Sequence, residues 1–291
     1  MQNLPLVSVI CISYNHAPYL VASLNSVLQQ SYPNIELLIA DDCSTDHSKE
    51  VIENWIKNHP TISFFPNLTN LGNTKTFNNV LKKANGEYII DLAADDILLP
   101  NCIEEQIQAF QNTNFSNLAV VYGNLELIDE KNQFISEHYT SNEHPQSGNI
   151  YKMVIGLSPK ICSVSSMIRK DVLESVGGYD ENLSYEDLDL WIKVSRKYDF
   201  QYIPKILVKK RELSNSLGAH FYKRNNPKTK KLHQSSYKIL QNAYRLNQTK
   251  EEHKALLRRI KYELKINIHS RNYSYILKYF LFYCKVFFKS F

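Results

Sequence analysis

Glycine is scarce in this sequence, with 8 residues in 291. The chain has no Gly-x-Gly-x-x-Gly and no Gly-Lys-Ser/Thr stretch, which excludes the dinucleotide fingerprint and the P-loop that hold phosphates on backbone amides. A phosphorylated ligand would therefore need another source of positive charge. A divalent cation bound by aspartate supplies such charge, because Mg²⁺ and Mn²⁺ prefer hard oxygen ligands.

Cysteine and long apolar runs are also scarce. The five cysteines are odd in number and form no Cys-x-x-Cys pair, which argues against a disulfide framework or a zinc site and fits a reducing cytoplasm. No stretch reaches about 18 uncharged apolar residues, so we expect no membrane-spanning helix. The N-terminus lacks the basic segment and apolar core of a secretory signal. We therefore expect a cytoplasmic protein.

Charge divides the chain into two regions. Residues 223–291 carry a balance of +14, whereas residues 1–222 carry −9, and together they give the net charge of +5. The change falls near a stretch rich in Asn, Pro and Lys, which is typical of a linker or loop. We predict a domain over 1–222, with halves of about 1–115 and 116–222, and a basic, mainly helical extension over 223–291.

The first region alternates short strands with amphipathic helices. Apolar, β-branched runs predict strands over 6–13, 35–40, 61–65 and 87–93. Helical spacing of apolar residues predicts helices over 19–30, 48–59 and 76–85. This alternation is typical of an α/β domain with a mainly parallel sheet.

Polar residues follow three of these strands, at 13–15, 41–46 and 93–96. Ligands of parallel sheets bind beyond the carboxyl ends of the strands. Asp95 and Asp96 are adjacent there, and adjacent carboxylates repel each other. One interpretation is a turn that caps a helix, since Asp caps helices and Pro100 suits a first helical turn. The other is a cation site, because a bound metal would offset the repulsion.

A second pair of adjacent acids, Glu186 and Asp187, precedes an apolar stripe that predicts a helix over 186–194. Acids are favoured in the first turn of any helix by the macrodipole, which is the structural interpretation. The functional interpretation is that one of the two faces a cleft as a general base. The sequence alone leaves both open.

Three segments together resemble the family 2 glycosyltransferases of the GT-A fold. They are "VSVICISYNHAPYLVASLNSVLQQSYPNIELLIADDCSTDHS", "NLGNTKTFNNVLKKANGEYIIDLAADDILLP" and "GGYDENLSYEDLDLWIKV", which lie in order over about residues 6–217. The resemblance implies a Rossmann-like sheet with flanking helices, and transfer of a sugar from a nucleotide donor to an acceptor hydroxyl. Each segment alone would be weak evidence for the family, but the three segments in this order are specific to it.

Applied position by position, the resemblance implies a nucleotide site. Ile12 and Tyr14 would flank the base, and Asp42 would hydrogen-bond it, most often a uracil in relatives. Lys75 lies where relatives often have a basic residue near the nucleotide. Arg211 would contact the diphosphate.

The resemblance also implies a metal and a base. Asp95 would meet the ribose or the metal, and Asp96 would coordinate the Mn²⁺ or Mg²⁺ that bridges the diphosphate. Asp187 would deprotonate the acceptor hydroxyl, with Glu186 fixing its position or binding the acceptor. A base without an enzymic nucleophile predicts inversion at the anomeric carbon.

Two positions depart from the family pattern. Ala93 replaces the first carboxylate that many relatives have, which weakens the ribose contact more than the metal site. Leu213 stands where many relatives have a histidine after Arg211, so the diphosphate role of Arg211 is the weakest of these assignments. His220 is either a further metal ligand or a surface histidine.

The C-terminal segment predicts an amphipathic helix. A basic stripe opposes an apolar face made of Ile276, Phe280, Tyr283, Cys284, Phe287 and Phe291. Such a helix suits a membrane interface, here the inner face of the cytoplasmic membrane, or docking on the body of the protein with its lysines in solvent. The basic charge would also permit nucleic-acid binding, but the aromatic face favours burial, so we expect no nucleic-acid partner.

The resemblance implies a glycosyltransferase that uses a nucleotide-sugar donor, namely a UDP-sugar, and a glycan or lipid-linked acceptor of surface polysaccharide, lipopolysaccharide or capsule assembly. Two other classes compete with it. A sugar-nucleotide nucleotidyltransferase shares the α/β layout and the metal but begins with a Gly-rich, basic phosphate loop, which "ISYNHAPYL" lacks. A non-catalytic nucleotide-sugar-binding or scaffold protein could dispense with Asp96 and Asp187, and both are present.

Overall fold

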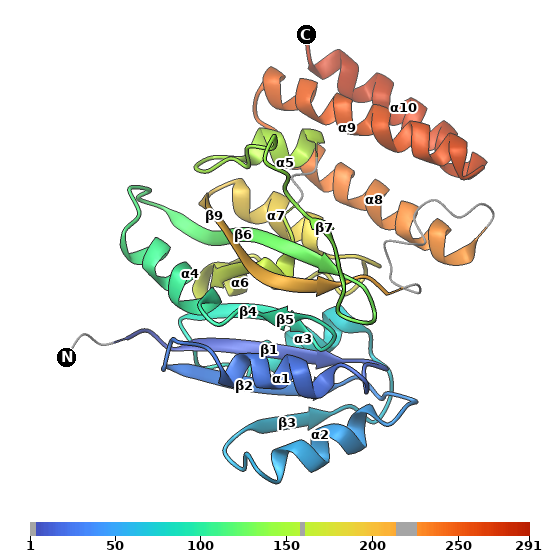
Figure 1. Cartoon of the computed structure of the whole chain (residues 1–291). Coiled ribbons are helices and arrows are strands. Elements are labelled where there is room, and N and C mark those ends of the chain that lie inside the picture. Colours follow the sequence, from blue (N-terminus) through green and yellow to red (C-terminus); the bar gives the residue numbers. More distant parts are fainter. Residues whose placement is uncertain (1–3, 158–160, 214–225) are drawn as a thin grey trace. The chain divides into compact units, whose positions relative to one another are not determined.

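The computed structural model describes residues 4–157, 161–213 and 226–291 (Figure 1). Its contacts divide the chain into two compact units. The first consists of Met1–Gly148, Ile161–Tyr179 and Tyr198–Glu212, and the second of Asn149–Lys160, Asp180–Lys197 and Leu213–Phe291. The charge pattern predicts a single boundary near residue 222, whereas the division by contacts is discontinuous and groups Asp180–Lys197 with the C-terminal helices.

The first unit begins with four parallel strands in the order β3-β2-β1-β4. They are β1 (Val7–Ser13), β2 (Ile35–Asp41), β3 (Ser63–Pro66) and β4 (Tyr88–Ala93). Strand β1 lies between β2 and β4 (Figure 1). Every residue of β1 is buried, as its β-branched sequence predicts for a central strand. Helices α1 (Leu20–Leu28), α2 (Ser48–Ile56) and α3 (Asn73–Leu81) alternate with the strands, which confirms the predicted α/β pattern.

The rest of the sheet is mixed. Strand β8 (Ser166–Arg169) is antiparallel to both β4 and β6 (Leu118–Ile128), and β9 (Asp199–Arg211) is parallel to β6. The short strands β5 (Ile97–Leu98) and β7 (Phe134–Glu137) pair antiparallel with β9 and β6. Helices α4 (Cys102–Gln111) and α6 (Lys170–Ser175) and a 3₁₀ turn, η1 (Ser163–Ser165), complete this part. The pairing of β5 with β9 brings the end of β9 beside residues 95–96.

Helix α3 begins three residues before the predicted segment 76–85. Its N-cap is Gly72, whose φ of 85° lies in the left-handed region that favours glycine. The amides of Leu71 and Gly72 each donate to the carboxylate of Asp42, at 2.8 Å. A long-range contact therefore fixes this helix start, which local spacing could not predict.

The described part of the second unit is helical. It contains α5 (Tyr151–Leu157), α7 (Asp187–Ser195), α8 (Pro227–Leu246), α9 (Lys250–His269) and α10 (Tyr273–Lys289). Asn226 caps α8 ahead of Pro227, and Thr249 with Glu252 forms a capping box at the start of α9. Helices α9 and α10 lie side by side (Figure 1). The predicted helical C-terminal extension is confirmed.

The last helix, α10, packs on α9 and α8, which belong to the same predicted extension, and it does not pack through the predicted apolar face. Helix α10 buries Tyr279, Phe282 and Val286, while Phe280 and Phe291 of the predicted face are exposed. The side of α10 that packs is therefore not the side that carries the predicted apolar face. Within the described ranges, no helix combines the length and hydropathy needed to cross a bilayer. The five cysteines, all of which lie in the described ranges, form no disulfide.

Candidate functional site

The ends of β1, β2 and β4 lie next to one another in the first unit. Ser13 pairs with Asp41, and Ile12 pairs with Ala93. The polar segments that follow these strands, at 13–15, 41–46 and 93–96, therefore meet at one edge of the sheet, which we call the rim. Ile12 is buried and Tyr14 is 44% exposed. This confirms that the predicted polar segments share an edge, which is where ligands of parallel sheets bind.

Hydrogen bonds join the loop after β1 to the loop after β2. The Asn15 side-chain oxygen accepts from Thr45 N at 2.8 Å, with Asn15 itself at a φ of 60°. The amide of His16 donates to Ser48 Oγ at 2.9 Å, and that of Ala17 to Asp46 Oδ2 at 3.1 Å. Burial opposes ionisation of Asp46, but hydrogen bonds from Ser48 and from the amide of Ala17 lower its pKa overall. The rim is therefore preorganised by its own short polar side chains.

Asp42 is 2% exposed and anchors the loop before α3. Its Oδ1 accepts from Leu71 N at 2.8 Å, from Asn67 Nδ2 at 2.9 Å and from Thr76 Oγ1 at 3.0 Å, and its Oδ2 accepts from Gly72 N. Lys75 is exposed in the first turn of the helix that this carboxylate helps to start. The structure thus gives Asp42 a positioning role, and its contact with a nucleotide base stays a prediction.

Asp95 and Asp96 lie between β4 and β5, and neither caps a helix. Residues 94–95 form a turn, in which Asp96 N donates to the carbonyl of Ala93 at 3.0 Å. The next helix, α4, has Asn101 as its N-cap, so only the cap part of the turn-and-cap interpretation is wrong. Asp96 is 3% exposed, and its Oδ1 accepts from the backbone amide of Arg211 at 2.7 Å. Burial, followed by the charge of Asp95, raises the pKa of Asp96 to about 8. An ionised Asp96 is therefore stable only with positive charge nearby.

Arg211 is 4% exposed and contacts both members of this pair. Its Nε donates to the carbonyl of Asp95 at 3.0 Å, and its two terminal nitrogens donate to the carbonyl of Asp129 at 2.8 Å and to Asn132 Oδ1 at 2.7 Å. The guanidinium also lies over the ring of Tyr19, 4.3 Å from its centroid. These contacts make Arg211 a structural cation of the rim, and its predicted diphosphate contact remains untested.

The residues at the rim fit a divalent cation of the Mg²⁺ or Mn²⁺ type. Across residues 4–157, 161–213 and 226–291, no group of three or more His, Cys, Asp or Glu side chains is placed to hold a metal. Mg²⁺, however, is usually held by one or two carboxylates, with water and substrate phosphates completing its shell. The Asp95–Asp96 pair supplies such a donor set. His220, the further candidate ligand, lies outside the described residues.

His16 is a residue that the sequence reasoning missed. Its Nδ1 lies 3.8 Å from Asp95 Oδ1, so the loop after β1 brings a titratable ring to the aspartate pair after β4. The signal was present, because His16 follows the end of a central strand by three residues. Only the register of β1 against β4 distinguishes it from its polar neighbours.

Glu186 and Asp187 lie in the second unit, as the N-cap and the first residue of α7. Asp187 Oδ1 accepts from Leu188 N at 2.7 Å. The structural interpretation of acids in the first turn is therefore confirmed, and it does not conflict with a catalytic role. That Asp187 serves the same reaction as Asp96 stays a prediction.

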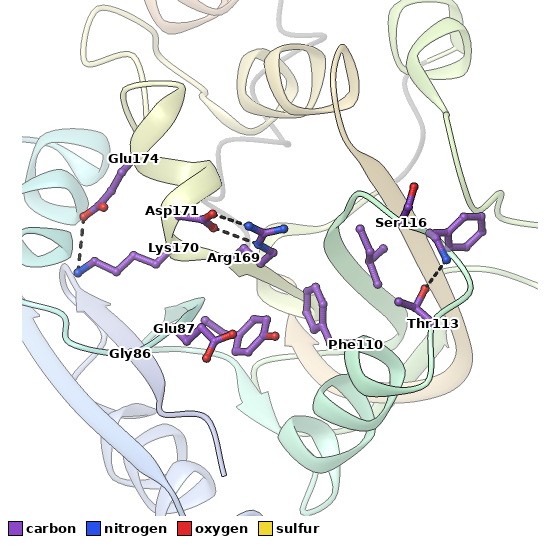
Figure 2. Close-up of a pocket in the computed structure, with 12 residues that line it drawn as sticks. Gly86, Glu87, Phe110, Thr113, Ser116, Arg169, Lys170, Asp171 and Glu174 are labelled. Atoms are coloured by element: carbon purple, nitrogen blue, oxygen red, sulfur yellow. Dashed lines mark hydrogen bonds and ion pairs between the residues drawn. The ribbon is translucent and has the colours of Figure 1, made fainter. Parts of the chain in front are cut away.

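A cavity of about 520 Å³ lies at the opposite end of β4, where Figure 2 shows the residues around it. Its lining includes Tyr88, at the start of β4, with Phe110. Its charged groups bind one another, since Arg169 pairs with Asp171, and Lys170 lies 3.6 Å from Glu174. None of the predicted site residues lines this cavity, so it does not belong to the rim described above.

The arrangement of sheet and rim is that of the GT-A glycosyltransferase fold. A structure of S. aureus TarS 1-349 in complex with UDP-GlcNAc is similar with a TM-score of 0.65 at 18% identity, over 87% of this chain and 70% of that one. The mannosyltransferase PcManGT from Pyrobaculum calidifontis, in complex with GDP-Man and Mn²⁺, gives 0.63 at 17% identity, over 95% and 75%. At these identities the likeness establishes the fold.

The sequence comparison establishes the family. The model of "Glycosyl transferase family 2" matches residues 8–177, and this chain belongs to that family. The chondroitin synthase of Escherichia coli is 30% identical over 207 residues, which cover 71% of this chain and 29% of that protein. An uncharacterized glycosyltransferase of Rickettsia typhi is 31% identical over 212 residues, 71% of this chain and 64% of that protein. The chain thus matches less than two thirds of the length of either relative.

Proposed function

We propose that this protein is a metal-dependent, inverting glycosyltransferase that moves a sugar from a nucleotide-sugar to an acceptor hydroxyl. The observation that carries the proposal is the Asp95–Asp96 pair, with Asp96 buried and Asp95 partly buried, at the carboxyl ends of parallel strands in a chain of glycosyl transferase family 2. A sugar diphosphate brings negative charge to this edge, and the chain has no Gly-rich loop to receive it. A cation held by Asp96 and Asp95 would neutralise the leaving diphosphate.

The remaining residues of the rim would bind the nucleotide. Ile12 and Tyr14 would flank the base, with Asp42 fixing the loop that faces it or bonding it directly. Lys75, which is exposed on α3, would approach the nucleotide. Arg211 would keep the Asp95–Asp96 turn in shape through its three hydrogen bonds, and contribute charge toward the diphosphate.

Asp187 would act as the general base and Glu186 would position it or the acceptor. The acceptor oxygen would transfer its proton to the Asp187 carboxylate as it attacks the anomeric carbon, and the bond to the diphosphate would break on the opposite face. A single displacement inverts the anomeric centre, so an α-linked donor gives a β-glycoside. A general base of this kind contributes about 10²- to 10⁴-fold in rate.

The donor that we propose is a UDP-sugar. TarS was solved with UDP and with UDP-GlcNAc, whereas PcManGT was solved with GDP-Man and Mn²⁺, so the fold accommodates both bases in different proteins. The acceptor would be a glycan or lipid-linked intermediate of surface polysaccharide, lipopolysaccharide or capsule assembly. The E. coli relative, which is a chondroitin synthase, supports a polysaccharide product.

A donor screen tests the reaction class. Purified protein is incubated with UDP-, GDP- and dTDP-sugars and Mn²⁺, and the released nucleoside diphosphate is measured with and without excess EDTA. We expect metal-dependent release of UDP from one UDP-sugar. Release of pyrophosphate from a sugar 1-phosphate and a nucleoside triphosphate would instead identify a nucleotidyltransferase, and nucleotide-sugar binding without turnover would identify a binding protein.

We also propose that α10 holds the protein on the inner face of the cytoplasmic membrane. With Tyr279, Phe282 and Val286 packed inside the second unit, the helix still exposes Leu277, Leu281 and Phe288, by 62%, 59% and 79%. These apolar residues have helical spacing, and residues 264–291 contain no Asp or Glu. An apolar stripe among lysines matches an anionic lipid surface, where each Lys near the surface contributes about 1 kcal/mol.

Flotation with lipid vesicles tests this surface. We expect wild-type protein to float with vesicles of phosphatidylcholine and phosphatidylglycerol but not with phosphatidylcholine alone. Leu277→Ser, Leu281→Ser and Phe288→Ser together should abolish flotation without a change in the circular dichroism spectrum. Leu68→Ser is the matched control, because Leu68 is 97% exposed on the first unit. Flotation of the triple variant at the wild-type level, or none by the wild type, would contradict the proposal.

A further inference from the structure

The segment that carries Glu186 and Asp187 is tied to α8 through polar contacts at its N-terminal side. The amide of Ser184 donates to Ser235 Oγ at 2.8 Å, and the hydroxyls of Tyr185 and Ser236 are hydrogen-bonded at 2.9 Å. Ser235 and Ser236 are 3% and 1% exposed. Two consecutive residues of α8 thus hold the two residues that directly precede the acid pair.

The same segment is held again beyond the acid pair. Asp189 is 1% exposed, and its carboxylate accepts from Asn242 Nδ2 on α8 at 3.3 Å and binds Lys193 Nζ at 2.6 Å. Further along, Arg196 donates to Glu252 on α9 at 2.7 Å and lies over the ring of Tyr151 on α5. Contacts from α8 and α9 therefore fix α7 along its length as well as at its start.

A buried ion pair lies behind Tyr185. Arg259 and Glu263, one turn apart on α9, are joined at 2.8 Å and have side chains that are 9% and 2% exposed. Burial and the charge of Glu263 raise the pKa of Tyr185. The phenol consequently stays protonated at physiological pH and keeps its hydrogen bond to Ser236. Tyr185 itself is partly buried, but its partners are buried, and hydrogen bonds to buried groups constrain direction more than apolar packing does.

We infer that the C-terminal helices position the proposed catalytic base, with Tyr185, Ser235 and Ser236 as positioning residues that touch no substrate. Hydrogen bonds on either side of residues 186–187 set the start of α7 and thereby the direction of the Asp187 carboxylate. The basic C-terminal region, which the charge pattern marks as an extension, would therefore contribute to catalysis by positioning the base. The inference rests on the proposed function, because it requires Asp187 to be the general base.

Removal of single oxygen atoms tests this inference. We would measure kcat and KM for the nucleotide-sugar that the wild type hydrolyses with Mn²⁺, in Tyr185→Phe, Ser236→Ala, the double variant and Ser235→Ala. A small displacement of a catalytic group can cost up to about 100-fold in rate, and we expect kcat to fall about tenfold in Tyr185→Phe. The KM for the donor should stay unchanged, since donor contacts are proposed on the first unit.

The double variant separates positioning through this hydrogen bond from general loss of packing. If Tyr185 and Ser236 act through one bond, the double variant should have the kcat of either single variant. Gln234→Ala, on an exposed position of the same helix, is the matched control and should keep wild-type kcat. Circular dichroism melting confirms that each variant is folded, and Ser235→Ala tests the second contact should Ser236→Ala unfold.

Two outcomes would overturn the inference. One is wild-type kcat in folded Tyr185→Phe and folded Ser235→Ala. The other is a parallel loss of donor affinity and kcat, which would indicate general damage. Asp187→Asn, assayed alongside, keeps this inference distinct from the proposed base. Full activity in Asp187→Asn refutes the base itself, whereas an inactive Asp187→Asn with fully active Tyr185→Phe and Ser235→Ala refutes only the positioning by α8.

Discussion

The two pairs of adjacent acids that we assign to the reaction differ in their surroundings. Asp95–Asp96 follows a buried strand, where Asp96 is 3% exposed and has its pKa raised to about 8. Glu186–Asp187 lies at the N-terminus of a helix and is partly exposed. A helix N-terminus carries positive partial charge and accommodates carboxylates, whereas a dry strand end does not. The first pair therefore suits a cation, and the second suits a proton acceptor that stays in contact with solvent.

The sharpest test of this contrast is Asp187→Asn. The amide keeps the size and the hydrogen bond to Leu188 N but cannot accept the proton, so we expect kcat to fall by about 10³-fold. Binding of UDP, measured by calorimetry with Mn²⁺, should change by less than about twofold. Glu181→Gln, an exposed acid of the same unit, is the control and should keep wild-type kcat. Normal turnover in Asp187→Asn would remove the base from the mechanism.

Asp96→Asn tests the other pair and should lower activity by about 10²-fold at saturating Mn²⁺. The expected cause is lost metal affinity, because a neutral amide oxygen is a weaker ligand than a carboxylate. Titration of Mn²⁺ into the protein with UDP present measures that affinity directly. Glu130→Gln, an exposed acid of the same unit, is the control. A variant with unchanged Mn²⁺ affinity would show that the cation, if any, binds elsewhere.

Asp96→Asn should raise the stability of the metal-free protein, although it lowers activity. The pKa of Asp96 is higher in the folded state than in the unfolded state, so its ionisation makes stability fall as pH rises from about 4 through about 8. Asn at this position carries no charge and can still accept from Arg211 N. Urea unfolding in EDTA should therefore find Asp96→Asn more stable than wild type at pH 8.5, by at least about 1 kcal/mol, and less so at pH 5.

Local patterns sufficed for the first four strands and for the location of the rim. The apolar runs at Val7–Ser13 and Ile35–Asp41 are strongly β-forming, and parallel pairing then brings their carboxyl ends together. Adjacent acids also occur elsewhere in the chain, so the pairs Asp95–Asp96 and Glu186–Asp187 could be singled out only because they lie in the segments that carry the family resemblance. The family match over residues 8–177 covers the first of these pairs and supports the fold that the resemblance implied.

Long-range pairing accounts for what the sequence did not reveal. Arg211 ends beside Asp96 because β9 pairs with β5, a register with no local signature. The His16–Asp95 contact depends in the same way on the order of β1 and β4. The face of α10 that packs could not be chosen by spacing either, since the helix is aromatic on more than one side. Each of these facts is a property of tertiary contacts rather than of local sequence.

Arg211→Ala measures how much the rim depends on its buried cation. The substitution removes three side-chain hydrogen bonds and leaves the carbonyls of Asp95 and Asp129 without that donor, so we expect a loss of about 2 kcal/mol in the free energy of unfolding. Lys75→Ala is the control, because an exposed lysine should change stability by less than about 0.5 kcal/mol. Equal stabilities in urea for the two variants would show that Arg211 is not structural.

The smallest effect that we expect is at Glu252, in the second unit. Burial opposes ionisation of this carboxylate, but hydrogen bonds from Gln248 N, Arg196 and Thr249 N lower its pKa below the ordinary value of 4.5. A depressed pKa in the folded state stabilises the protein above about pH 4.5, and this contribution is lost as pH falls through the folded-state pKa. Glu252→Gln should therefore cost about 1 kcal/mol at pH 7, and its difference from wild type should shrink between pH 5 and pH 3. Urea unfolding at these pH values measures the difference, and a constant difference would mean that the Arg196–Glu252 pair contributes through packing rather than through charge.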